Sequence, residues 1–254
     1  MSFHDWIFSI TPEGSDINGA WKLPHILTLV GCIAVIVLFA FTVRKKDEKV
    51  RTITVRILIG LILFFEIARR VINFIRGDHV TLNDYLYTLL PRPWCAIACW
   101  TLIVAMFVNK KFFWNFASVT AFVCALIFFA YPEAGFTNKY VTFEHLYSIA
   151  THALLLITSL SLITLKFTKF DYKTAWKEGI CLAVVYVYAF LEIYLLDIAS
   201  DPLYFMPDND VANVLGGMSY ALYLPLYIVF LCVYFGSFYL AQYLSGKKKN
   251  KKTA

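Results

Sequence analysis

The sequence has few charged residues. Asp, Glu, Lys and Arg make up only 16% of the 254 residues, whereas 60% of the residues are hydrophobic. Ordinary soluble domains contain roughly 25% charged residues, so this composition excludes a water-soluble globular protein. The net charge of +6 does not indicate a nucleic-acid partner, because much of the positive charge lies in short clusters beside apolar segments. We therefore expect a polytopic membrane protein that binds no nucleic acid.

The sequence also lacks the signs of a disulfide framework, a cleaved leader and an internal repeat. All six cysteines lie in apolar stretches and show no disulfide-like spacing. Residues 1–18 contain three acidic residues and no Lys or Arg, whereas a signal peptide begins with a basic region. We therefore expect the first span to be retained. The two halves of the chain show no repeat, which argues against an inverted-repeat transporter.

Seven apolar segments are long enough to cross a membrane, which takes about 20 residues in a helix. The segments cover approximately residues 23–43, 53–75, 84–108, 112–131, 143–165, 179–199 and 217–243. The connections between them are too short to form a soluble domain. The sequence therefore predicts an all-α fold in which residues 1–254 form one integral membrane domain, a polytopic bundle of seven transmembrane helices.

Positive charge alternates between the connections. Lys and Arg gather in the connections after the first, third and fifth segments and in the tail at 246–254, whereas the other connections are mainly acidic. Short loops rich in Lys and Arg stay on the cytoplasmic side of a membrane. The pattern predicts that the N-terminus lies outside and the C-terminus inside, with residues 246–254 as a basic cytoplasmic tail of a cell-membrane protein.

A group of ionisable residues stands inside the second and third segments, where each charge costs roughly 2.5 to 3.5 kcal/mol at the bilayer centre. Glu66, Arg69 and Arg70 lie in the second segment and Arg92 in the third. Glu66 and Arg70 are four residues apart, a spacing at which side chains pair on one helix face. Two interpretations remain open: an internal ion pair that locks helices together, or a cavity wall whose surplus arginines face an anion.

The fifth and sixth segments add further polar residues. His145 and His152 are two helical turns apart and share a face, and Tyr188 precedes Glu192 by one turn. Counted along the helices, these residues lie between the membrane midplane and the outer surface. We therefore predict a polar pocket that opens outward and binds a membrane-lipid headgroup or another small anion. The alternative is a separate packing or counter-ion role for each residue. The predicted substrate-binding residues are Glu66, Arg69, Arg70, Arg92, Tyr188 and Glu192.

Two prolines interrupt the third segment. Pro91 and Pro93 remove backbone donors, and such a break survives in a bilayer only where other helices bury it or water reaches it. Cys95 stands on the first regular turn after the break, three residues from Arg92. An arginine and a helix N-terminus both favour a thiolate. Cys95 is therefore our candidate nucleophile, with His152 or His145 as general base; the alternative is a small apolar packing residue.

A zinc site is a further alternative for this region. Cys95 and Cys99 are four residues apart, and with His145 and His152 they would supply the ligands of a Cys₂His₂ site. The two histidines are about 10 Å apart along their helix, which is too far for them to share one ion easily. We therefore expect neither a metal nor another cofactor.

The stretch from Leu90 to Cys95 reads Leu-Pro-Arg-Pro-Trp-Cys. It is similar to the pattern Leu-Pro-x-His-x-Cys of the YwaF-like bacterial integral membrane proteins, which are related to a eukaryotic transmembrane lipid acyltransferase. Here Pro93 stands in the place of the histidine. Three further parts of the chain are similar to family segments, namely the region of Glu66, the histidines of the fifth segment, and the stretches at 192–195 and 201–204.

This resemblance implies a chemistry. The YwaF-like relationship implies acyl transfer between phospholipids in a bacterial plasma membrane, with Cys95 as the nucleophile that carries the acyl group. Because Pro93 replaces the motif histidine, the resemblance assigns the base to His152 or His145 on the facing helix. Membrane lipids are then the expected partners. A transporter or binding protein for a small anion, without covalent chemistry, remains the alternative function.

Overall fold

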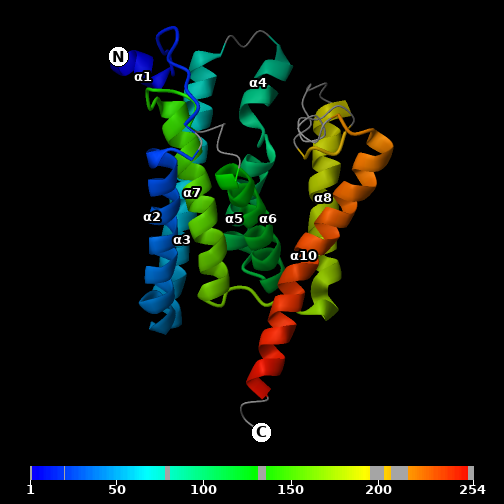
Figure 1. The fold of residues 1–254 in the computed structure, drawn as a ribbon. Coiled ribbons are helices and arrows are strands. Elements are labelled where there is room, and N and C mark those ends of the chain that lie inside the picture. The colour runs from blue at the N-terminus through cyan, green and yellow to red at the C-terminus, as the bar shows by residue number, and fades with distance from the viewer. Residues whose placement is uncertain are drawn as a thin grey trace. The chain divides into compact units, whose positions relative to one another are not determined.

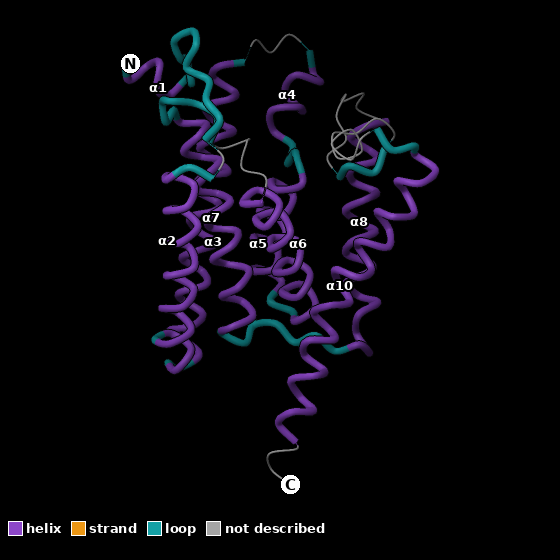
Figure 2. The backbone as a smooth tube through the Cα atoms, viewed as in Figure 1, coloured by secondary structure: helices purple, strands orange, loops and turns teal. Residues whose placement is uncertain are grey.

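The computed structural model describes residues 2–19, 21–77, 81–130, 136–194, 203–206 and 217–250. In these residues every regular element is a helix, and the β-contacts are limited to an isolated bridge between Asp16 and Asn138. Figure 2 shows this all-helical backbone. The chain forms two compact units, residues 1–168 and residues 169–254.

The described residues of the first unit form seven α-helices, which Figure 1 labels. They are α1 (Phe3–Ile7), α2 (Leu23–Phe41), α3 (Glu48–Arg76), α4 (Leu82–Leu89), α5 (Trp94–Val108), α6 (Lys111–Ala130) and α7 (Phe143–Thr164). Local capping fixes several helix starts: the carboxylate of Asp47 accepts from the backbone N–H of Val50 at the start of α3, and Thr81 and Asp84 form a capping box at the start of α4.

The centre of the first unit is α6, which packs between α5 and α7. Small residues such as Ala117 and Ala121 are fully buried on α6 and let neighbouring backbones approach closely. Ser118 Oγ donates a hydrogen bond of 2.9 Å to the carbonyl of Ser159 on α7. The helices α2 and α3 pack against α7, and α3 also packs against α5. This arrangement places α3, α5 and α7 around the ionisable residues of the predicted site.

The second unit contains α8 (Ala175–Tyr194) and the long helix α10 (Tyr220–Asn250). Three tyrosines on one face of α10 donate hydrogen bonds to consecutive backbone carbonyls in the segment 203–206. The tyrosines are Tyr220, Tyr223 and Tyr227. Tyr186 of α8 also donates to the hydroxyl of Tyr227 at 2.8 Å. A tyrosine stripe in this helix therefore holds a connecting segment and the neighbouring helix.

The helices agree with an all-α membrane protein. Five helical stretches among the described residues are long and apolar enough to cross a membrane, and α5 is a shorter apolar helix. The helix α3 has 29 residues but carries several charges, so it falls outside this set of five. The count of seven spans, the orientation and the single domain over residues 1–254 therefore stay predictions. The connection residues 131–135 and 195–202, which include part of two predicted spans, lie outside the described residues.

The predicted interruption of the third segment by Pro91 and Pro93 is present. The structure divides the range 84–108 into α4, which ends at Leu89, and α5, which begins at Trp94. Leu90 and Pro93 between them are extended, and the peptide bond before Pro93 is cis. Proline cannot donate a backbone hydrogen bond and clashes with the preceding turn, so two prolines in three residues unwind the helix. At the other end of the chain, α10 continues to Asn250, beyond the predicted start of the tail.

Candidate functional site

The unwound segment at 90–93 is held by the two arginines of α3. Arg70 Nε donates a hydrogen bond of 2.9 Å to the carbonyl of Leu89, the last residue of α4. Arg69 Nη1 donates at 3.5 Å to the carbonyl of Arg92. The last carbonyls of a helix have no partner within the helix and carry partial negative charge. The arginines thus donate hydrogen bonds to backbone carbonyls that have no helical partner at the proline break. The sequence did not indicate this role.

Glu66 occupies the centre of a buried hydrogen-bond network. Its side chain is 0% exposed, and its carboxylate accepts from Arg70 Nη1, from Trp100 Nε1 at 3.1 Å, and from the hydroxyl of Tyr147. The network therefore joins α3, α5 and α7. The i,i+4 ion pair that the spacing indicated is present. A buried carboxylate with three donors is well satisfied.

Aromatic rings cover both arginine head groups. The guanidinium of Arg69 lies 5.0 Å from the centre of the Tyr147 ring, and that of Arg70 lies 5.3 Å from the centre of the Trp100 ring. A ring face attracts a cation within about 6 Å. Tyr147 and Trp100 were not identified from the sequence, although an indole or phenol inside an apolar helix needs a polar partner for its tip.

Cys95 lies beside this network. It is in the first turn of α5, two residues after Pro93, and the residue is partly exposed. Its thiol is close enough to Arg69 and Glu66 to interact electrostatically with both. Cys99, one turn further along, is fully buried. Cys95 is therefore the more exposed residue of this pair, and it lies at the N-terminus of α5.

His152 on α7 also lies within the electrostatic reach of Arg69. Its ring stacks on Phe128, with centroids 3.9 Å apart, and its Nδ1 is 2.7 Å from the carbonyl of Ser148. Because a carbonyl only accepts, Nδ1 must carry the hydrogen. The neutral ring then keeps its lone pair on Nε2, which is the form that a general base requires.

His145 has a different environment. Its Nδ1 is 2.7 Å from the hydroxyl of Thr142, the residue that caps the start of α7. It takes no part in the hydrogen-bond network around Glu66, because that network is formed by residues of α3, α5 and Tyr147. Of the two predicted bases, the structure brings His152 to Arg69.

Glu192 and Tyr188 belong to the second unit. The Tyr188 hydroxyl donates a hydrogen bond of 2.6 Å to Glu192 Oε1, and Glu192 is buried. The i,i+4 spacing thus brings these two predicted residues together on α8. Arg70 forms an ion pair with Glu66 of its own helix. Contact of Glu192 with the other predicted site residues stays a prediction.

The chemistry of the cluster follows from its charges. One carboxylate, Glu66, is accompanied by the guanidinium groups of Arg69 and Arg70, and the backbone carbonyl of Arg92 accepts from Arg69. The cluster is therefore positive and suited to an anionic group such as a phosphate. Within the described residues, no three His, Cys, Asp or Glu side chains are grouped so that they could hold a metal ion.

A bundle of apolar helices with a broken helix and a buried ionic network defines a multi-pass membrane protein. The chain belongs to the TMEM164 family, whose family model matches residues 20–239. This is a family of transmembrane proteins, and the matched range includes the whole network around Glu66 as well as α8 and most of α10. No curated protein and no solved structure matches the chain.

Proposed function

We propose that the protein is a membrane enzyme that transfers acyl groups between phospholipids, and that it acts in a bacterial plasma membrane. The observation that carries the proposal is the position of Cys95: a partly exposed residue on the first turn of α5 that interacts electrostatically with Arg69. A helix N-terminus and a nearby cation favour the thiolate, the reactive form of cysteine. The resemblance of the stretch at 90–95 to the YwaF-like motif supports the same chemistry.

In the first step, His152 Nε2 removes the proton from Cys95 Sγ, and the thiolate attacks the carbonyl carbon of a phospholipid ester. A carbon–sulfur bond forms and the ester carbon–oxygen bond breaks. The departing lysolipid oxygen takes the proton from the imidazolium. In the second step, His152 accepts the proton of another lysolipid hydroxyl, whose oxygen attacks the thioester; the carbon–sulfur bond breaks and Cys95 recovers its proton.

The arginines take the role of phosphate ligands in this proposal. Arg70 is already committed to Glu66 and to the carbonyl of Leu89, so we assign direct phosphate contact to Arg69 and Arg92. Glu66 then serves chiefly as a positioning residue, because it fixes Arg70 and the ring of Tyr147 over Arg69. Correct placement of a headgroup would hold the ester near the thiol.

The test is capture of the acyl intermediate. Purified protein in detergent is incubated with a phospholipid that carries an alkyne-tagged acyl chain, and a thioester is recognised by its release with neutral hydroxylamine. We expect labelling of wild-type protein, no labelling of Cys95→Ser, and normal labelling of the matched control Cys99→Ser. Lipid acyl transfer that continues in Cys95→Ser would refute the proposal.

A second candidate function is an anion carrier or binding protein without covalent chemistry. The observation that favours it is the charge of Arg69, which among the described residues contacts a carbonyl and a ring but forms no ion pair. Uptake of phosphate or a phosphorylated compound into proteoliposomes tests it. Uptake that is lost in Arg69→Gln and unchanged in Cys95→Ser would select the carrier over the enzyme.

A further inference from the structure

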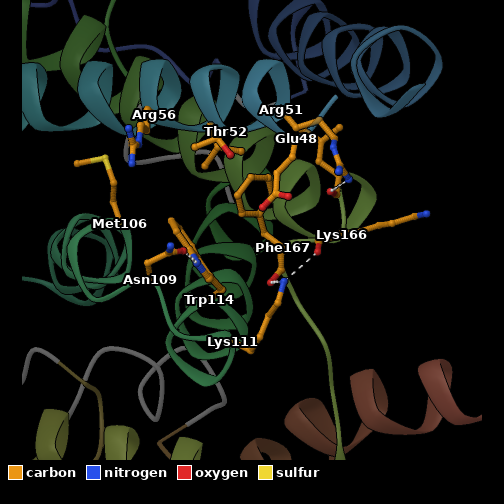
Figure 3. Close-up of a pocket in the computed structure, with 12 residues that line it drawn as sticks. Glu48, Arg51, Thr52, Arg56, Met106, Asn109, Lys111, Trp114, Lys166 and Phe167 are labelled. Atoms are coloured by element: carbon orange, nitrogen blue, oxygen red, sulfur yellow. Dashed lines mark hydrogen bonds between the residues drawn. The ribbon is translucent and has the colours of Figure 1, made fainter. Parts of the chain in front are cut away.

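A second polar site lies at the other end of the first unit. A cavity of about 390 Å³ is formed where α3 begins, α5 ends, α6 begins and α7 ends (Figure 3). Its volume is within the range of about 300–1,000 Å³ that is usual for ligand pockets. On α3, Arg56 of the cavity and Glu66 of the buried network are ten residues apart, or about 15 Å along the helix. The cavity is therefore distinct from the Cys95 site.

The lining of the cavity is strongly basic. Four basic residues and one acidic residue, Glu48, belong to it. The ion pairs of the described residues involve none of these five, so within this part of the chain no ion pair neutralises the basic residues. An excess of Lys and Arg at helix ends orients a membrane protein, but orientation requires no cavity. The basic lining residues are Arg51, Arg56, Lys111 and Lys166.

Arg51 provides an unsatisfied donor in this cavity. Its Nη1 donates a hydrogen bond of 3.1 Å to the carbonyl of Leu165. Its Nε is buried and has no hydrogen-bond partner. Buried donors in folded proteins are nearly always satisfied, and an exception calls for an acceptor such as an ion or ligand. The Nε of Arg51 is thus a donor that a hydrogen-bond acceptor of a ligand bound in the cavity would satisfy.

Lys111 is fixed in place at the opposite wall. Its Nζ donates to the carbonyls of Lys166 and Phe167, at 3.2 and 2.9 Å, as the dashed lines in Figure 3 show. An ammonium group has three donors, so one hydrogen remains for a ligand. Asn109 accepts from Trp114 Nε1 at 3.0 Å and closes the same wall. Lys111 and Arg51 are therefore both held by backbone carbonyls of the protein.

The backbone at the cavity adopts uncommon conformations. Asn109 and Lys166, at the ends of α5 and α7, have φ angles of 48° and 68°. After α7, the N–H of Lys166 bonds to Ile163 and that of Phe167 to Leu162, which is the Schellman pattern that usually carries glycine at the position of Lys166. Strained backbone of this kind concentrates at binding sites.

We infer that this cavity binds the phosphate group of an anionic phospholipid headgroup. Arginine and lysine residues of α3 and α6, together with Lys166 just after α7, line it, and guanidinium and ammonium groups are the usual phosphate ligands. The adjoining helix surfaces are apolar and exposed, at Ile53 and Ile57 of α3 and Phe107 of α5, and would accommodate acyl chains. Basic pockets between transmembrane helices at the membrane boundary recognise anionic lipids in this way.

The test is lipid binding to the full-length protein in detergent, followed by native mass spectrometry. The probes are phosphatidylglycerol, phosphatidylcholine with the same acyl chains, and inorganic phosphate. We expect phosphatidylglycerol to bind at least tenfold more tightly than phosphatidylcholine. Arg51→Gln and Arg56→Gln should each weaken binding about fivefold, since one basic group near an anionic lipid is worth about that factor. Arg44→Gln, an exposed arginine outside the cavity, is the matched control and should bind normally.

The outcomes separate the sources of the phosphate. If inorganic phosphate displaces phosphatidylglycerol when both are present at the same concentration, the cavity binds phosphate groups, but its ligand is a soluble phosphate compound and not a lipid. Equal affinity for the two lipids, or an equal loss in Arg44→Gln, would overturn the inference. If Arg51→Gln fails to fold, Arg56→Gln decides, because Arg56 is exposed. Binding should persist in Cys95→Ser, so this inference and the proposed acyl transfer can fail independently.

Discussion

Replacement of Glu66 with glutamine is expected to lower the free energy of unfolding of the first unit by about 3–5 kcal/mol, the usual cost of removing one partner from a buried ion pair. Glutamine has nearly the same shape as glutamate, so the effect isolates the charge. The Arg70 side chain is only 13% exposed and the Glu66 side chain is 0% exposed. The substitution leaves the arginine charge buried and without its counter-ion.

The hydrogen bonds of the carboxylate fix the orientation of the new amide. Glu66 Oε2 accepts from both Arg70 and Trp100, so the amide oxygen takes this position. The amide nitrogen then lies at the position of Oε1 and can donate to the hydroxyl of Tyr147, because a hydroxyl both donates and accepts. The expected loss of stability therefore comes from the missing charge.

The measurement is the free energy of unfolding in mixed micelles, by denaturant titration followed through tryptophan fluorescence. The matched control is Glu144→Gln: Glu144 also pairs with an arginine, Arg76, at 3.7 Å, but its side chain is 61% exposed. Exposed pairs contribute about 0–1 kcal/mol, so this control should stay near wild type. If Glu66→Gln loses no more free energy of unfolding than Glu144→Gln, the reasoning from the buried network is refuted.

Three further predictions concern separate contacts. Ser118→Ala should cost about 1 kcal/mol of unfolding free energy, because Ser118 Oγ donates to the Ser159 carbonyl between α6 and α7; an unchanged midpoint in denaturant would contradict the contact. Lys166→Gly should raise stability by about 1 kcal/mol, because glycine adopts the left-handed conformation without steric cost; a lower melting temperature would contradict this. The hydrogen bonds from Ser2 lower the pKa of Asp5 below its ordinary value. The capping box should therefore stabilise α1 at pH values above the pKa that Asp5 has in the unfolded chain, and this stabilisation should be lost as the pH falls through the lower pKa that Asp5 has in the folded protein. An NMR titration that gives Asp5 its ordinary pKa would contradict this.

The helices and the ion pair were predictable from the sequence. Long apolar runs have few alternatives to a helix in a membrane, and the four-residue spacing of Glu66 and Arg70 places them on one face. The break at Pro91 and Pro93 was also predictable, although the sequence did not show whether the helix would bend or unwind. These features depend on neighbours in the chain, which a sequence displays directly.

The long-range partners were not predictable in the same way. Trp100 and Tyr147 contact Glu66 from other helices, and nothing in the spacing of an aromatic residue within an apolar run identifies its partner. The hydrogen bond from Arg70 to the Leu89 carbonyl needs the packing of α3 against α4. The basic cavity was missed for another reason: Arg51 and Lys111 were interpreted only as orientation signals, because their convergence appears only after folding.

The buried network around Glu66 has a consequence for biogenesis. The charges of α3 leave the ribosome first, whereas their partners Trp100 and Tyr147 are 34 and 81 residues further along the chain than Glu66. Until those later helices are synthesised, α3 must remain at the translocon or beside a chaperone, where water or protein can solvate its ions. Assembly of this protein is therefore expected to be delayed and cooperative, with stable lipid integration of α3 completed only when α7 arrives.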